Sequence, residues 1–348
     1  MLVINPSKPF YINKKEKVIR MGNFKETGKE IEYDDDILLK LFEYIKEPID
    51  RTMLVNKLSK ETKYSNEDIL NVINYLVDEN FISNSEDIQK ILSDEYYNRQ
   101  KLYFYMLNDK VINMTNEILN KKILILGVGG IGSITLELLA RSGFKNFTIV
   151  DNDIVEKSNL IRQLSYDLSD IGKLKVNAIR DRLLKINEDI KVEIINKKIN
   201  NEQDIENEIR VSDFVLCTID KPARIIRRVI NDICIKEEKP VLFSGFSEHV
   251  AMIGPFVVPN KTACLSCIEK ESNDEPLYNV KITPSFGAVC NFISSIVSNE
   301  IINYFLKFSE NNLIGKTMMF NMYTYETNII KWKKNKTCKK CGERIDSK

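Results

Sequence analysis

The stretch Ile123–Gly132 reads ILILGVGGIG and sets the architecture of most of the chain. Its first four residues form an apolar run typical of a strand buried on both faces, and Ile131–Arg141 has the apolar spacing of a helix. Strand and helix patterns then alternate through Phe147–Val150, Lys173–Ile186, Val192–Ile195, Phe214–Cys217, Ala223–Lys236 and Val241–Ser244. A later helix is predicted near Val289–Phe305, followed by β segments near Lys316–Tyr323 and Glu326–Trp332. This order predicts an α/β fold with a Rossmann-like, doubly wound, mainly parallel sheet.

The turn between the first strand and its helix is rich in glycine. Gly127 permits a tight turn, and Gly129 and Gly130 let the backbone approach a phosphate or a ribose. Gly132 lets the helix pack closely on the strand, and the helix N-terminus presents free N–H groups to negative charge. The turn therefore predicts a nucleotide site, although it does not distinguish NAD from ATP.

The residues after this turn favour ATP. Asp151 ends the next strand, where a carboxylate can accept hydrogen bonds from ribose hydroxyls. Arg162 and Lys175 follow, and an enzyme that expels pyrophosphate needs such cations because negative charge grows on the phosphate oxygens. Asp220 follows Phe214–Cys217 at the carboxyl end of a parallel strand, where it can hold Mg²⁺. A nicotinamide oxidoreductase is a minor alternative.

Four of the seven cysteines form two Cys-x-x-Cys pairs, Cys264/Cys267 and Cys338/Cys341. Two such pairs supply the four thiolates that tetrahedral zinc prefers, and a filled ligand shell is typical of a structural site. Free thiols or a redox pair are the alternative. Cys290 is near a helix start, where a thiolate would be stabilised, so a nucleophilic role is a minor alternative to packing. The single histidine, His249, is expected in a loop between two strands.

Composition limits the possible partners and location. Lys plus Arg total 51 against 50 Asp plus Glu, which gives no reason to expect nucleic-acid binding. No apolar run is long enough to span a membrane, and the first residues lack the pattern of a signal peptide. We therefore expect a cytoplasmic protein whose cysteines are reduced or bind metal.

The part of the chain before the Rossmann pattern is expected to form a separate unit. Residues 1–90 predict two strands and three short helices, an arrangement that resembles a winged-helix module, for peptide recognition or for packing. Residues 91–120 are expected to form a helical connector, and residues 121–348 the catalytic domain with its zinc site.

The ordered motifs Gly127–Gly132, Asp151–Asp153, Ser158–Gln163, Gly172–Lys175 and Asp220 resemble the ThiF/MoeB/HesA family of ubiquitin-activating-type adenylating enzymes. The resemblance implies ATP, Mg²⁺ and structural zinc. It implies nucleotide contacts from Gly127, Gly129, Gly130, Gly132, Asp151, Asp153, Ser158, Asn159 and Gln163. It implies catalytic roles for Arg162, Lys175 and Asp220. Arg99, in Asn98-Arg99-Gln100, matches an arginine that reaches the γ-phosphate of the partner subunit, which implies a homodimer.

Within this family, the additional unit at residues 1–90 is similar to that of the microcin C-type peptide adenylyltransferases. That likeness implies adenylation of the free C-terminal carboxylate of a ribosomal peptide in antibiotic biosynthesis. Two alternatives remain. One is activation of a ubiquitin-fold sulfur carrier for thiamin or molybdopterin synthesis, and the other is a non-catalytic protein that docks a leader peptide.

Overall fold

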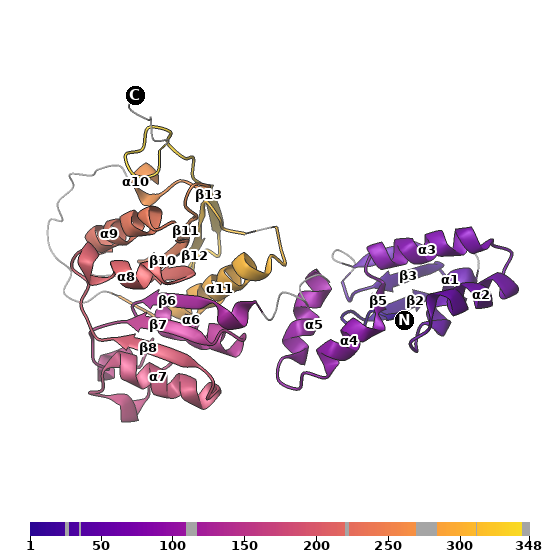
Figure 1. The fold of residues 1–348 in the computed structure, drawn as a ribbon, viewed down its shortest axis with the longest axis horizontal. Helices are drawn as coiled ribbons and strands as arrows, with labels where there is room; N and C mark the ends of the chain where they lie inside the picture. The colour runs from indigo at the N-terminus through magenta and orange to yellow at the C-terminus, as the bar shows by residue number, and fades with distance from the viewer. Residues whose placement is uncertain are drawn as a thin grey trace. The chain divides into compact units, whose positions relative to one another are not determined.

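The computed structural model describes residues 1–24, 28–34, 36–108, 117–219, 223–268, 284–310 and 312–342, apart from the side chains of residues 223 and 224. The chain divides into two compact units, residues 1–115 and 116–348 (Figure 1). Among the described residues, no helix is both long enough and apolar enough to cross a membrane.

The second unit is built on a sheet of eight described strands, in the order β13-β12-β11-β10-β9-β6-β7-β8. Their bounds are β6 Lys122–Leu126, β7 Asn146–Val150, β8 Lys191–Ile195, β9 Phe214–Cys217, β10 Val241–Ser247, β11 Val250–Val257, β12 Lys316–Asn321 and β13 Thr327–Lys331. Strands β10, β9, β6, β7 and β8 are parallel, whereas β11, β12 and β13 extend the sheet in antiparallel pairs. The prediction of a mainly parallel Rossmann-like sheet is confirmed.

Helices cover both faces of this sheet. The helices are α6 Gly132–Arg141, α7 Lys175–Ile186, α8 Glu206–Arg210, α9 Ala223–Lys236, α10 Leu265–Ile268 and α11 Gly287–Leu306, with 3₁₀ turns at Ile118–Asn120, Lys157–Asn159, Leu168–Asp170 and Glu202–Asp204. Leu124 and Leu126 of β6 share a buried cluster with Ile230 of α9. Phe214 of β9 contacts Phe305 of α11, on the opposite face. Side chains alternate across a strand, so α9 and α11 lie on different faces and the sheet is doubly wound.

The first unit is an α+β module with two small sheets. Strands β2 Phe10–Asn13, β3 Val18–Met21 and β4 Lys29–Glu32 form an antiparallel sheet in that order, and β1 Leu2–Ile4 pairs with β5 Ile82–Asn84. The helices are α1 Ile37–Tyr44, α2 Arg51–Glu61, α3 Asn66–Asp78, α4 Ser85–Leu92 and α5 Asn98–Leu107. Ser65 caps α3 by accepting the Asp68 N–H at 3.2 Å, and Asp68 accepts the Ser65 N–H in return.

Several elements differ from the sequence-based expectation. Strands β1 and β2 were not predicted, and α4 and α5 belong to the first compact unit. Residues 93–97 separate α4 from α5, so the chain from Ser85 to Leu107 forms two short helices and not one long one. Asp94 holds this bend, because its carboxylate accepts the N–H groups of Tyr96 and Tyr97.

Candidate active site

The parallel strands bring the loops after β6, β7 and β9 to one edge of the sheet, beside the middle of β10. Leu126 pairs with Cys217, and Cys217 pairs with Phe243, so the last residues of β6 and β9 lie in one row with the last β10 residue that pairs with β9. Loops at the carboxyl edge of such a sheet are where ligands bind in open α/β folds. The glycine turn and the residues around it therefore lie at the position that this fold uses for chemistry.

The glycine turn is held by close packing that leaves one position open. Gly127 has a φ of +90°, which favours glycine. A Cβ at Gly132 would lie 1.9 Å from the Gly127 carbonyl oxygen, and one at Gly130 would lie 2.9 Å from Cys290 Sγ. A Cβ at Gly129 would have only Gln163 Nε2 nearby, at 3.9 Å. Gly132 and Gly130 thus permit close packing, whereas the space beside Gly129 is available to a ligand.

Two hydroxyl groups that the sequence motifs do not mark, those of the half-buried Thr218 and the buried Tyr166, brace this turn. Thr218, directly after β9, donates its hydroxyl to the Gly127 carbonyl at 2.8 Å. Tyr166 donates its hydroxyl to the Val128 carbonyl at 2.7 Å, and burial raises its pKa well above the usual value. Neither residue belongs to a local motif, because both contacts join segments far apart in the sequence. These bonds fix the direction of the turn's backbone.

Asp151 is tied to the same turn. Its carboxylate accepts the Val128 N–H at 2.9 Å and the Asp153 N–H at 2.8 Å. Burial raises the pKa of this carboxyl, and the positive charge of Lys175 and the two N–H donors oppose that rise. Each carboxylate oxygen keeps a free lone pair, so Asp151 can still accept from ribose hydroxyls.

Lys175 begins α7 and points back toward the same edge. It is 5% exposed, and its ammonium lies 2.8 Å from a carboxylate oxygen of Asp153. Its backbone N–H also donates to the Asp153 carbonyl, at 3.0 Å. Asp153 therefore holds the lysine chain in place, and a phosphate would have to share this ammonium with the carboxylate.

The segment Ser158–Gln163 wraps beside the turn. Arg162 donates to the Ser158 carbonyl at 2.9 Å and keeps further N–H groups for a ligand. Asn159 is buried and accepts the Glu156 N–H, so its side chain shapes the segment. Gln163 is 4% exposed, and its Oε1 has no hydrogen-bond partner in the structure. A buried amide oxygen without a partner is costly, which fits a site that a polar ligand completes.

The structure does not test the roles of two proposed catalytic residues. Asp220 lies outside the described residues. Arg99 is exposed on α5, in the first unit. Their roles at ATP remain predictions.

The four cysteines of the two Cys-x-x-Cys pairs come together, with their sulfur atoms all within 4.8 Å of one another. Neighbouring sulfur atoms lie 3.3 Å (Cys267 to Cys341), 3.8 Å (Cys264 to Cys338) and 3.9 Å (Cys264 to Cys267) apart. Tetrahedral zinc with Zn–S bonds of about 2.3 Å requires sulfur atoms roughly 3.8 Å apart, and a disulfide requires about 2.05 Å. The geometry fits a four-thiolate zinc site that joins α10 to the segment after β13.

The remaining candidates have simpler surroundings. Cys290, in the first turn of α11, is buried against Gly130, and burial raises the pKa of its thiol while Arg162 opposes the rise. A neutral, buried thiol favours packing over nucleophilic catalysis. His249 is exposed in the turn between β10 and β11, as expected.

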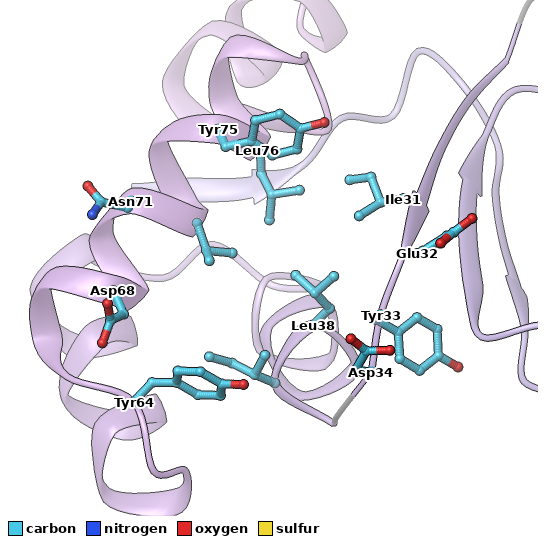
Figure 2. A pocket seen from close by; sticks show the side chains of 12 residues that line it. Ile31, Glu32, Tyr33, Asp34, Leu38, Tyr64, Asp68, Asn71, Tyr75 and Leu76 are labelled. Atoms are coloured by element: carbon cyan, nitrogen blue, oxygen red, sulfur yellow. The ribbon is translucent and has the colours of Figure 1, made fainter.

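The first unit contains a separate groove, which Figure 2 shows between β4 and α3. Its volume is about 420 Å³, and Leu38, Tyr64 and Leu76 point into it. Strand β4 is the end strand of its sheet. Tyr33 donates its N–H to the Lys17 carbonyl on the β3 side, so by alternation the backbone groups of Glu30 and Glu32 point away from β3. An apolar groove thus runs beside an edge of β4 that pairs with no other strand among the described residues.

Comparison with known proteins identifies the family. Residues 97–340 match the ThiF family. The chain is 33% identical to ubiquitin-like modifier-activating enzyme 5 of Caenorhabditis elegans, over 45% of this chain and 40% of that protein's length. It is 26% identical to the molybdopterin-synthase adenylyltransferase of Escherichia coli, over 64% of this chain and 88% of that protein.

A solved structure matches both units. The crystal structure of E. coli MccB with AMPCPP and selenomethionine MccA has a TM-score of 0.83 and 22% identity, and the match covers 98% of this chain and 99% of that chain. The likeness in fold therefore includes the N-terminal module as well as the sheet. Because the family match extends over residues 97–340, the chain belongs to the ThiF family and is an adenylyltransferase of that family.

Proposed function

We propose that this enzyme adenylates the C-terminal carboxylate of a ribosomally made peptide and releases pyrophosphate, as a step in the biosynthesis of a modified, antibiotic-type peptide. The observation that carries the proposal is the full-length likeness to MccB, solved in complex with MccA, because it extends through the N-terminal module. The match to the molybdopterin-synthase adenylyltransferase covers 64% of the chain, whereas the match to MccB covers 98%.

The groove of the N-terminal module supports a peptide substrate. An extended segment could add to the open edge of β4 through the backbone groups of Glu30 and Glu32. Alternate side chains of that segment would meet Leu38, Tyr64 and Leu76. Backbone bonds would supply affinity, and the apolar pocket would select the side chains.

Catalysis in this proposal is positioning and electrostatics. A peptide carboxylate is already ionised at pH 7, so the attack on the α-phosphate needs no general base. Asp151 would hold the ribose, and Arg162 and Lys175 would stabilise charge on the phosphates. Asp220 is the proposed ligand of Mg²⁺, which would neutralise charge on the departing pyrophosphate. Arg99 is proposed to reach the nucleotide of a partner subunit.

An exposed apolar surface supports a homodimer. Between residues 154 and 171, five aliphatic side chains are exposed, with Leu168 at 72%; the set is Ile154, Ile161, Leu164, Leu168 and Ile171. Exposed aliphatic side chains that form a contiguous patch are typical of an interaction surface. The same segment contains Arg162, a proposed nucleotide contact. A second copy of the chain bound to this surface would therefore lie next to the nucleotide site of the first copy, and the reverse would hold by symmetry.

ATP–pyrophosphate exchange tests the function. With Mg²⁺, full-length protein should exchange labelled pyrophosphate into ATP only when a short peptide encoded beside its gene is present as the free acid. If a carrier protein that ends in Gly-Gly supports exchange and none of the peptides does, the result would instead favour sulfur-carrier activation. Absence of exchange with either, in folded and zinc-loaded protein, would support a docking protein that does not adenylate.

A further inference from the structure

We propose that Arg227 binds the carboxylate of the acyl substrate, which makes it a specificity-determining residue of the adenylation site. This inference rests on the proposed function. Arg227 is on α9, and its Nη2 donates to the carbonyl of Ser244 at 2.8 Å. Ser244 lies in β10, one residue past Phe243, so the guanidinium is held at the same carboxyl edge as the glycine turn.

The sheet gives the position of Arg227 relative to the nucleotide. Phe243, Cys217 and Leu126 lie in one row on the adjacent strands β10, β9 and β6. Neighbouring strands are about 4.8 Å apart, so Phe243 and Ser244 lie roughly 10 Å along the edge from the glycine turn. Asp151 follows β7, on the other side of β6. A nucleotide with its ribose at Asp151 and its phosphates at the turn would therefore point its reacting end toward β10.

The guanidinium has unused hydrogen-bonding capacity. Its Nε is buried and has no partner in the structure, and the same is true of the neighbouring Ser244 hydroxyl. Among the described residues, no carboxylate forms an ion pair with Arg227. A guanidinium offers five N–H donors in a planar fork that matches a carboxylate. A partly buried cation with free donors beside a buried free hydroxyl is suited to an oxyanion.

Two neighbouring residues of β10, Phe243 and Gly245, lie close to the guanidinium of Arg227. Nη2 lies 3.0 Å from where a Cβ of Gly245 would stand, so a side chain at that position would press on the guanidinium. The guanidinium also lies 6.0 Å from the centre of the Phe243 ring. Burial raises the pKa of the Cys217 thiol at the end of β9, and the charge of Arg227 opposes that rise.

The test compares one peptide in two forms, the free acid and the C-terminal amide, using a peptide that supports pyrophosphate exchange. Binding to the full-length protein is measured with a non-hydrolysable ATP analogue present. Wild-type protein should prefer the acid by roughly ten- to hundredfold, the range for a hydrogen bond to a charged group. Arg227→Gln should lose this preference while it keeps wild-type affinity for the amide and for the ATP analogue.

Two further variants separate binding from structure. Gly245→Ala retains the arginine but crowds it, and should reduce the acid preference without affecting the amide. Arg180→Gln removes an exposed arginine of α7 and should leave the preference unchanged. Equal binding of acid and amide by the wild type, or an intact acid preference in Arg227→Gln, would overturn the inference. A parallel loss of amide and ATP-analogue binding would also overturn it, since that pattern means a structural role. Absence of peptide-dependent exchange in the wild type would instead refute the proposed function.

Discussion

Replacing Gly129 with alanine should weaken ATP binding and leave the fold intact, whereas replacing Gly132 should damage the fold itself. The two glycines are three residues apart in one turn, but their surroundings differ. A methyl group at Gly129 meets its first neighbour, Gln163 Nε2, at 3.9 Å, which is ordinary contact. A methyl group at Gly132 meets the Gly127 carbonyl oxygen at 1.9 Å.

The expected magnitudes follow from these distances. In Gly132→Ala the turn has to move by more than 1 Å, and overpacking of this kind costs about 1–3 kcal/mol or more of unfolding free energy. In Gly129→Ala nothing collides, and the smaller entropy of the unfolded chain adds about 0.4–1 kcal/mol of stability if the native backbone angles suit alanine. A methyl group in space that a ligand needs should cost about 1–3 kcal/mol of binding, which is roughly 5- to 150-fold in Kd.

Thermal unfolding and isothermal titration with ATP check both variants. Gly129→Ala should have a wild-type or higher Tm with a raised Kd for ATP, and Gly132→Ala should have a lowered Tm. A wild-type Kd for ATP in well-folded Gly129→Ala would refute the assignment of the space beside Gly129 to the nucleotide. A wild-type Tm for Gly132→Ala would refute the packing role of Gly132.

Three other perturbations probe the remaining parts of the site. Burial raises the pKa of Asp151 above its usual range, so ATP binding should weaken as the pH falls through that raised pKa. Asp151→Asn should bind ATP weakly at every pH and should not show this loss of binding at low pH. A chelator, or Cys338→Ser, should remove one zinc per chain and lower the unfolding free energy by several kcal/mol, and an unchanged Tm on metal removal would exclude a structural zinc. Leu164→Asp combined with Leu168→Asp should convert a dimer to monomers in sedimentation experiments, with loss of exchange activity; a dimeric double variant would show that the apolar surface is not the interface.

The parts of the fold that the sequence predicts are those whose signal is local. The strand and turn of Ile123–Gly132 contain an apolar run and glycines with separate steric tasks, and both appear in the structure. The cysteine pairs could be predicted because zinc requires four thiolates, and two short-spaced pairs supply them. The sequence predicts that a strand follows His249 but does not give the bounds of β11, since Gly254-Pro255 interrupts its apolar pattern.

The parts that could not be predicted depend on contacts between distant segments. Thr218 braces Gly127 across 91 residues, and Tyr166 braces Val128 across 38. Arg227 and its exposed neighbour Arg228 belong to the same predicted helix. The contact of Arg227 with the Ser244 carbonyl of β10 shows which of the two faces the sheet, and the helix pattern does not predict that contact. The groove beside β4 likewise requires the packing of α3 against a sheet that includes the unpredicted β2. Local patterns thus predict the turn and the metal ligands, and tertiary packing supplies the braces and the groove.

The spacing of the cysteine pairs has a consequence for the denatured state. Cys264 and Cys338 are 74 residues apart, as are Cys267 and Cys341. Zinc that stays bound to the thiolates during denaturation would close a loop of that length, and a cross-link of this span reduces the entropy of an unfolded chain by the equivalent of about 4.5 kcal/mol. The zinc-bound denatured chain would also be more compact, so urea titrations should have a smaller m-value with zinc than after chelation.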